Sequence, residues 1–155
     1  TNLRYLTGFT GSNGMAVVGR DVREIRFIGD MPHTWVGSDY MRSFLDMFAF
    51  ERESDSSLVV AAGVREEWVK EPPGVRVTNL STHYGPLNYD IQTYGRAVTV
   101  NLRAGLRMPP GGIVVWSPLE QPILSASVDG VPNAVQGAEV RVRKLPATVT
   151  IRYAK

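Results

Sequence analysis

Apolar and polar side chains alternate along most of the carboxyl-terminal part of the chain. Residues 87–94 show this pattern, and residues 97–102 resume it after a short break at Gly95-Arg96. A period of two places alternate side chains on one face of an extended strand, so each run predicts a half-buried strand. Two such runs across a short glycine-containing break predict an antiparallel hairpin.

More short runs of this kind follow, each bounded by proline or glycine. The run Ile113–Trp116 is apolar throughout, and so it predicts a strand buried on both faces, with Trp116 in the core. The pair Asp129-Gly130 predicts a tight turn. Many short strands separated by proline and glycine residues favour a mainly β fold, an antiparallel β-sandwich. The other predicted strands cover residues 57–62, 123–128, 139–143 and 148–153, with a short strand beginning at Val75 and a loop over Ser81–Pro86.

One segment has a period of three to four residues instead. Tyr40, Met41, Phe44 and Leu45 form an apolar stripe that continues to Phe48. This spacing predicts one amphipathic helix near residues 38–50, with Ser38 as its capping residue and a solvated turn over 51–55. We expect the stripe to be a packing face, and we predict self-association through the Tyr40–Phe48 helix if nothing else covers it.

Length and charge limit the classes of protein to which this chain can belong. A chain of 155 residues suits a β-strand leader over residues 1–26 and a helix plus β-sandwich domain over 27–155, packed as one compact unit. The formal charge of +2 is too small to indicate a nucleic-acid partner, and no apolar run approaches the length of a bilayer span. The chain has no cysteine, which excludes disulfides. It begins at Thr1, so we expect a fragment of a longer protein or a processed product.

No catalytic constellation is visible in the sequence. Glu51 with Glu53 and Glu66 with Glu67 are paired carboxylates by composition alone, and solvated turns explain them better. His33 near two acidic residues could suggest a metal site, but the spacing is irregular and a structural histidine is favoured. No catalytic residue, metal or cofactor is therefore expected.

Carbohydrate contact is the one binding role that the residue types suggest. Trp35 follows His33 in a predicted loop ahead of the helix, where an indole ring could stack on a sugar. Trp35 and His33 are therefore the candidate contact residues. The sequence assigns no cellular location.

Residues 2–14, with the sequence NLRYLTGFTGSNG, resemble the first strand and loop of the amino-terminal domain of the creatinase and Xaa-Pro aminopeptidase family. The resemblance covers only about residues 2–18. In that family the chemistry lies in a separate domain with two metals held by Asp, His and Glu. Nothing in this chain matches that domain, so the resemblance implies a fragment without peptidase activity.

Residues 27–155 resemble the carboxyl-terminal end of an α/α-barrel glycoside hydrolase. The matching segments are Asp30–Trp35, Ser38–Tyr40 and Phe48–Glu53 for the last barrel helix, and Ala61–Gly63, Tyr84–Leu87 and Pro109–Gly112 for the β-sandwich that follows it. The resemblance implies that a catalytic barrel domain in the parent protein is the partner. The acid and base carboxylates of that family would lie upstream, so none is assigned here.

Three hypotheses of function follow from these observations. The leading one is a non-catalytic accessory β-sandwich of a carbohydrate-active enzyme, which packs against a catalytic domain or makes weak carbohydrate contact. The second is a structural or recombined domain without native activity, because the two resemblances join between Gly19 and Phe27 and suggest a chimera. The third is a fragment of an Xaa-Pro aminopeptidase-like metallopeptidase that lacks its catalytic domain.

Overall fold

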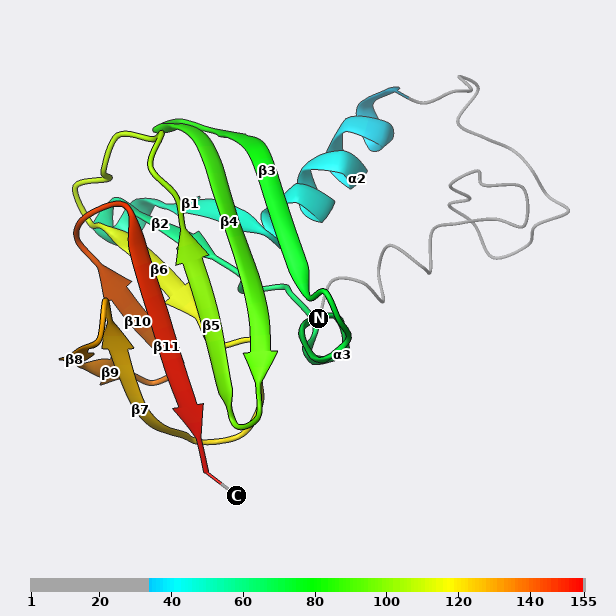
Figure 1. The fold of residues 1–155 in the computed structure, drawn as a ribbon. Helices are drawn as coiled ribbons and strands as arrows, with labels where there is room; N and C mark the ends of the chain where they lie inside the picture. The colour runs from blue at the N-terminus through cyan, green and yellow to red at the C-terminus, as the bar shows by residue number, and fades with distance from the viewer. Residues whose placement is uncertain (1–33, 155) are drawn as a thin grey trace, which may run out of the picture. The chain divides into compact units, whose positions relative to one another are not determined.

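The computed structural model describes residues 34–154 (Figure 1). The chain divides between Phe44 and Leu45 into two units, which are described separately. The candidate residue His33 and the predicted β-strand leader over residues 1–26 lie outside the described residues. Within residues 34–154, no helix is both long enough and apolar enough to cross a bilayer.

The second unit is built from two β-sheets, which confirms the mainly β, sandwich-like prediction (Figure 1). The five-stranded sheet has the order β1 (Ala49–Arg52), β2 (Ser57–Val60), β6 (Ile113–Trp116), β10 (Glu139–Val142) and β9 (Val135–Gln136). The six-stranded sheet has the order β3 (Val75–Thr82), β4 (Gly85–Tyr94), β5 (Ala97–Leu102), β11 (Ala147–Tyr153), β7 (Ile123–Val128) and β8 (Val131–Asn133). All described strand pairs are antiparallel except β2 with β6, which run parallel.

The inner faces of the two sheets share one apolar core. Leu58 and Val115 of the five-stranded sheet belong to the same buried cluster as Ile91, Val100 and Ile151 of the six-stranded sheet. Each fully buried aliphatic side chain contributes about 1.5–3 kcal/mol through the hydrophobic effect. The alternation that the sequence shows in residues 87–102 is the alternation between this core and the outer surface of the six-stranded sheet.

Two predicted turns are confirmed. Strands β4 and β5 form a hairpin in which Gln92 lies opposite Thr99, and Gly95 in its turn has φ of 60°. Asp129 and Gly130, with φ of 52° and 79°, join β7 to β8. These left-handed conformations are open to glycine and tolerated by aspartate, which explains the residue types found there.

The helix differs from its predicted bounds. Helix α2 spans Thr34–Asp46, so it begins four residues before Ser38, and none of its residues is buried. Ser38 is not the capping residue, because it lies inside the helix and its Oγ donates to the carbonyl oxygen of Trp35 at 2.8 Å. The predicted last turn of the helix is instead the start of β1, where Phe50 pairs with Val59 of β2. Backbone pairing with a neighbouring strand satisfies this segment better than an isolated helical turn would.

The predicted loop Ser81–Pro86 is also shorter than expected. Strand β3 continues to Thr82 and β4 begins at Gly85, so only His83 and Tyr84 lie in the turn. The β3–β4 register shifts between Val77 and Leu80, and the N–H of Asn79 donates to Oδ1 of Asn88 at 2.9 Å across the shift. Such a bulge at an edge strand interrupts the row of free backbone groups that could pair with another chain.

Candidate functional site

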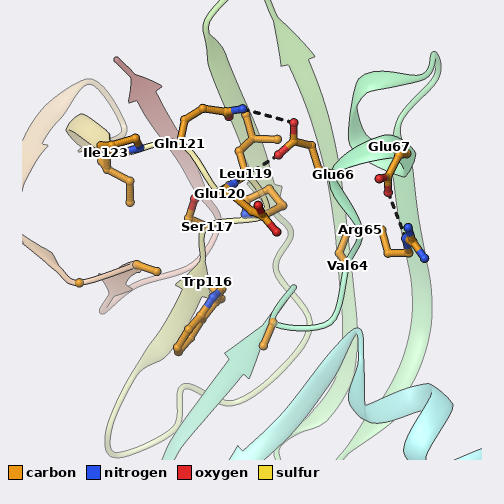
Figure 2. Close-up of a pocket in the computed structure, with 15 residues that line it drawn as sticks. Val64, Arg65, Glu66, Glu67, Trp116, Ser117, Leu119, Glu120, Gln121 and Ile123 are labelled. Carbon is orange, nitrogen blue, oxygen red and sulfur yellow. Dashed lines mark hydrogen bonds and ion pairs between the residues drawn. The ribbon is translucent and has the colours of Figure 1, made fainter. Parts of the chain in front are cut away.

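A hollow of about 710 Å³ lies at one end of the sandwich (Figure 2). One wall is residues 116–123, the segment that leads from β6 into β7. The other wall is residues 64–67, which lead into the short helix α3 (Glu66–Lys70). Ala62, Gly137 and Ala138 complete the lining.

Trp116 lies at the edge of this hollow. The prediction that it lies in the core is therefore wrong. The three preceding residues of β6 are fully buried, but the Trp116 side chain is 37% exposed. Trp116 is the last residue of the strand and lies opposite Glu139 of β10. Its position at the strand end leaves one side of the indole ring without a covering neighbour strand, and a partly exposed ring of this kind is a surface on which apolar groups can stack.

Glu66 fastens the two walls of the hollow together (Figure 2). Its Oε1 accepts from Nζ of Lys70 and from Nε2 of Gln121 at 3.3 Å, and its Oε2 accepts from the backbone N–H of Glu120 at 3.3 Å. The ion pair with Lys70, followed by the Glu120 N–H, lowers the pKa of Glu66 below its usual value. Glu66 was expected in a solvated turn. In the structure it accepts hydrogen bonds from two residues that lie 54 and 55 positions further along the chain.

The floor of the hollow holds a buried hydroxyl pair. Ser117 Oγ lies 2.8 Å from the hydroxyl of Tyr153 and donates to the carbonyl oxygen of Leu119 at 3.1 Å. Burial raises the pKa of Tyr153. A nucleophilic serine needs a neighbouring base, and His83, the one histidine in residues 34–154, is not among the lining residues. This serine is therefore a structural group that holds the loop to β11.

A second charged cluster covers the outer face of the five-stranded sheet. We call Arg52, Asp55, Glu139 and Arg141 the ion-pair lattice. Arg52 donates from Nη1 to Glu139 Oε1 at 2.7 Å and from Nη2 to Asp55 Oδ2 at 2.9 Å, while Arg141 Nη2 donates to the same Asp55 oxygen at 2.8 Å. These partners, Arg52 first, lower the pKa of Asp55, and Glu139 above all raises the pKa of Arg52.

The strand order explains what this lattice covers. Arg52 lies on β1 and Glu139 on β10, with β2 and β6 between them. The Arg52–Glu139 bonds therefore span β2 and β6, whose paired residues Val59 and Val114 are fully buried although they are not part of the inner core. An arginine can do this because its aliphatic stem packs on apolar surface while its guanidinium stays paired.

The paired carboxylates Glu51 and Glu53 do not line the hollow. Trp35 lies on α2, in the first unit, and is 72% exposed. Glu51 accepts a hydrogen bond from the backbone N–H of His83 at 2.8 Å, and Glu53 begins the 3-10 helix η1 (Glu53–Asp55). Among residues 34–154 no three His, Cys, Asp or Glu side chains are grouped as metal ligands would be.

Trp116 is the residue that the sequence analysis missed. The available signal was its place at the end of an apolar run, directly before Ser117-Pro118, because a proline two residues later ends the strand there. The arrangement offers one stacking ring and a rim of carboxylates and amides. Groups of these kinds are suited to binding a ligand.

Comparison with known proteins identifies no relative: no protein-family model, no curated protein sequence and no solved structure matches the chain.

Proposed function

We propose that the Leu45–Lys155 sandwich is a non-catalytic accessory domain of a carbohydrate-active enzyme, and that it makes weak contact with sugar at the Trp116 hollow. The observation that carries the proposal is the partly exposed Trp116 ring beside a hollow with a polar rim. Pyranose rings have apolar faces bordered by hydroxyl groups. An indole ring can stack on such a face while neighbouring amides and carboxylates bind the hydroxyls.

The rim offers groups of the right kind for hydroxyl recognition. Gln121 and Glu120 are exposed, and each is anchored to Glu66, Gln121 through its side-chain amide and Glu120 through its backbone N–H. An anchored rim loses little conformational freedom when a ligand binds. A single stacking ring supplies only part of the affinity of a tight site, so we expect dissociation constants near the millimolar end of the scale. The resemblance to the end of a barrel glycoside hydrolase supports the same role, with a catalytic barrel domain as the partner in the parent protein.

The test uses the three tryptophans of the chain as matched positions. The full chain is titrated with neutral oligosaccharides by calorimetry, as wild type and as Trp116→Ala, Trp68→Ala and Trp35→Ala. Trp68 is the closest control, because it is 36% exposed and is stacked near Phe48, with ring centroids 6.4 Å apart, rather than lining the hollow.

We expect Trp116→Ala to weaken binding by about fivefold or more, with the other two variants unchanged. Loss of binding in Trp35→Ala alone would move the contact to helix α2, as the sequence first suggested. If no oligosaccharide binds, or if Trp116→Ala binds like wild type, the hollow is not a sugar site. The absence of any sugar binding would favour the second reading, a structural or recombined domain.

A further inference from the structure

The charges around the hollow are unevenly paired. Four charged residues line it: Arg65, Glu66, Glu67 and Glu120. Arg65 Nε donates to Glu67 Oε2 at 3.0 Å, which neutralises both, and Glu66 is paired with Lys70. Among residues 34–154 the Glu120 carboxylate has no ion-pair partner, although its backbone is held by the N–H bond to Glu66. Among the residues that the structure describes, the hollow therefore keeps one negative charge without a counterion.

The carboxylate nearest to Trp116 across the sheet does not change this balance. Glu139 lies opposite Trp116 in the β6–β10 register, but both of its carboxylate oxygens accept from Arg52, at 2.7 and 3.1 Å. Glu139 is thus committed to the ion-pair lattice. Of the carboxylates that line the hollow, Glu120 is therefore the one without an ion-pair partner among the described residues.

The Trp116 ring and the Glu120 carboxylate favour the same ligand chemistry. The face of an indole attracts a cation through its quadrupole, and an unpaired carboxylate attracts an ammonium group directly. Both disfavour the carboxylates and sulfates of acidic glycans. A sugar that has an amino group beside its hydroxyls would satisfy the apolar ring and the carboxylate at once.

On these grounds we infer that the Trp116 hollow prefers glycans with free amino groups, such as glucosamine oligomers, over neutral and acidic glycans. This inference rests on the proposed sugar-binding function and assigns its ligand class. Glu120 is the residue that sets the preference, and Trp116 is the residue that supplies binding common to all sugars.

The experiment compares four tetrasaccharides on the full chain at low ionic strength, namely tetramers of glucosamine, N-acetylglucosamine, glucose and galacturonic acid. The first two share a backbone and differ in the charge of one substituent on each ring. We expect the glucosamine tetramer to bind about two- to fivefold more tightly than its N-acetylated form, the range of an exposed ion pair, and the galacturonate tetramer to bind most weakly. At about 0.5 M salt this difference should disappear.

Two carboxylate variants serve as a matched pair. Glu120→Gln should reduce glucosamine binding to the level of the N-acetylated tetramer and leave glucose binding unchanged. Glu71→Gln removes an exposed carboxylate that also forms no ion pair among residues 34–154 but does not line the hollow, so the ranking of the four ligands should stay the same.

The outcomes separate the inference from the proposed function. If Trp116→Ala weakens all tetramers but Glu120→Gln leaves the glucosamine preference intact, or if no such preference exists, the ligand class is wrong and the sugar site stands. If Trp116→Ala changes nothing, or no tetramer binds, the sugar site is overturned and the ligand class falls with it.

Discussion

The ion-pair lattice and the Trp116 hollow both contain arginine and carboxylate side chains, but they differ in how completely those charges are paired. In the lattice, Arg52 and Arg141 engage Asp55 and Glu139, and every charged group has a charged partner. In the hollow, Glu66 and Glu67 are paired, but Glu120 has no ion-pair partner within residues 34–154. The lattice closes over a sheet face, whereas the hollow leaves a ring and a charge exposed to solvent.

This difference indicates where binding can occur. A charge that is already paired offers little to a ligand, because the existing bond must first be broken. An unpaired group beside an exposed aromatic ring can form new bonds without that loss. We therefore expect substitutions in the lattice to change stability, and substitutions in the hollow to change binding.

The largest effect on stability is expected from Arg52→Ala. The substitution removes the bonds to both carboxylates, and with them the link from β1 across β2 and β6 to β10. We expect the free energy of unfolding to fall by about 2 kcal/mol, typical for lost hydrogen bonds between charged groups, as measured by urea denaturation. The free energy of unfolding of Arg52→Lys should lie between those of Arg52→Ala and wild type. Lysine keeps the charge and the aliphatic stem but lacks the planar guanidinium that donates to two carboxylates at once. An Arg52→Ala protein as stable as wild type would mean that the lattice is not a stabilising cover.

Acid should weaken the lattice through Asp55. Its pKa is lowered by Arg52, Ser57 and Arg141, so the ionised carboxylate is favoured by folding. The stability that it contributes is present above the ordinary aspartate pKa of 3.8 and is lost as the pH falls from there through the lowered pKa of the folded protein. Asp55→Asn should therefore be less stable at neutral pH and should lose less stability on acidification. Parallel pH profiles of unfolding for the two proteins would contradict this.

A more local effect is expected from Glu66→Ala. This change releases residues 120 and 121 from α3 but leaves the core untouched. Amide hydrogens in residues 117–122 should exchange faster, while those of β4 and β5 keep their protection. Because the pKa of Glu66 is lowered from 4.5, wild type should show the same loosening only as the pH falls below that value. Glu67→Ala is the control, since its partner Arg65 lies within the same wall.

The smallest effect on stability is expected from Glu120→Gln. Its carboxylate is exposed and forms no ion pair among residues 34–154, so the free energy of unfolding should stay within about 0.5 kcal/mol of wild type. Chemical denaturation beside the sugar titrations would show binding and stability changing independently. A loss well above that limit would reveal a structural role for Glu120 and end the contrast between the two regions.

Most of the strands could be predicted from the sequence, because alternation in a strand is a local property. Residues 87–94 and 97–102 show this in the chain, and the hairpin between them needs only one short turn. The predicted helix bounds were about four residues too late in the sequence. Residues 48–50 continue the apolar spacing, although they lie beyond the helix, in the turn and at the start of β1.

The candidate site could not be predicted, because its parts come together through distant pairings. Arg52 meets Glu139 across 87 positions of the sequence, and Glu66 meets Gln121 across 55. The apolar runs of β2 and β6 indicate strands buried on both faces, but neither run identifies the other as its parallel partner.

The sequence by itself determined which segments are extended and which side of most of them is apolar, because the two-residue period is set by the backbone within each strand. Only the tertiary structure decided that Trp116 lies at an open edge, that Glu66 is bonded to a distant loop and that Glu120 has no ion-pair partner in the described part of the chain. A side chain's neighbours depend on the order in which strands pair and on the loops between them. That order is settled by packing of the whole sandwich, and no local pattern records it.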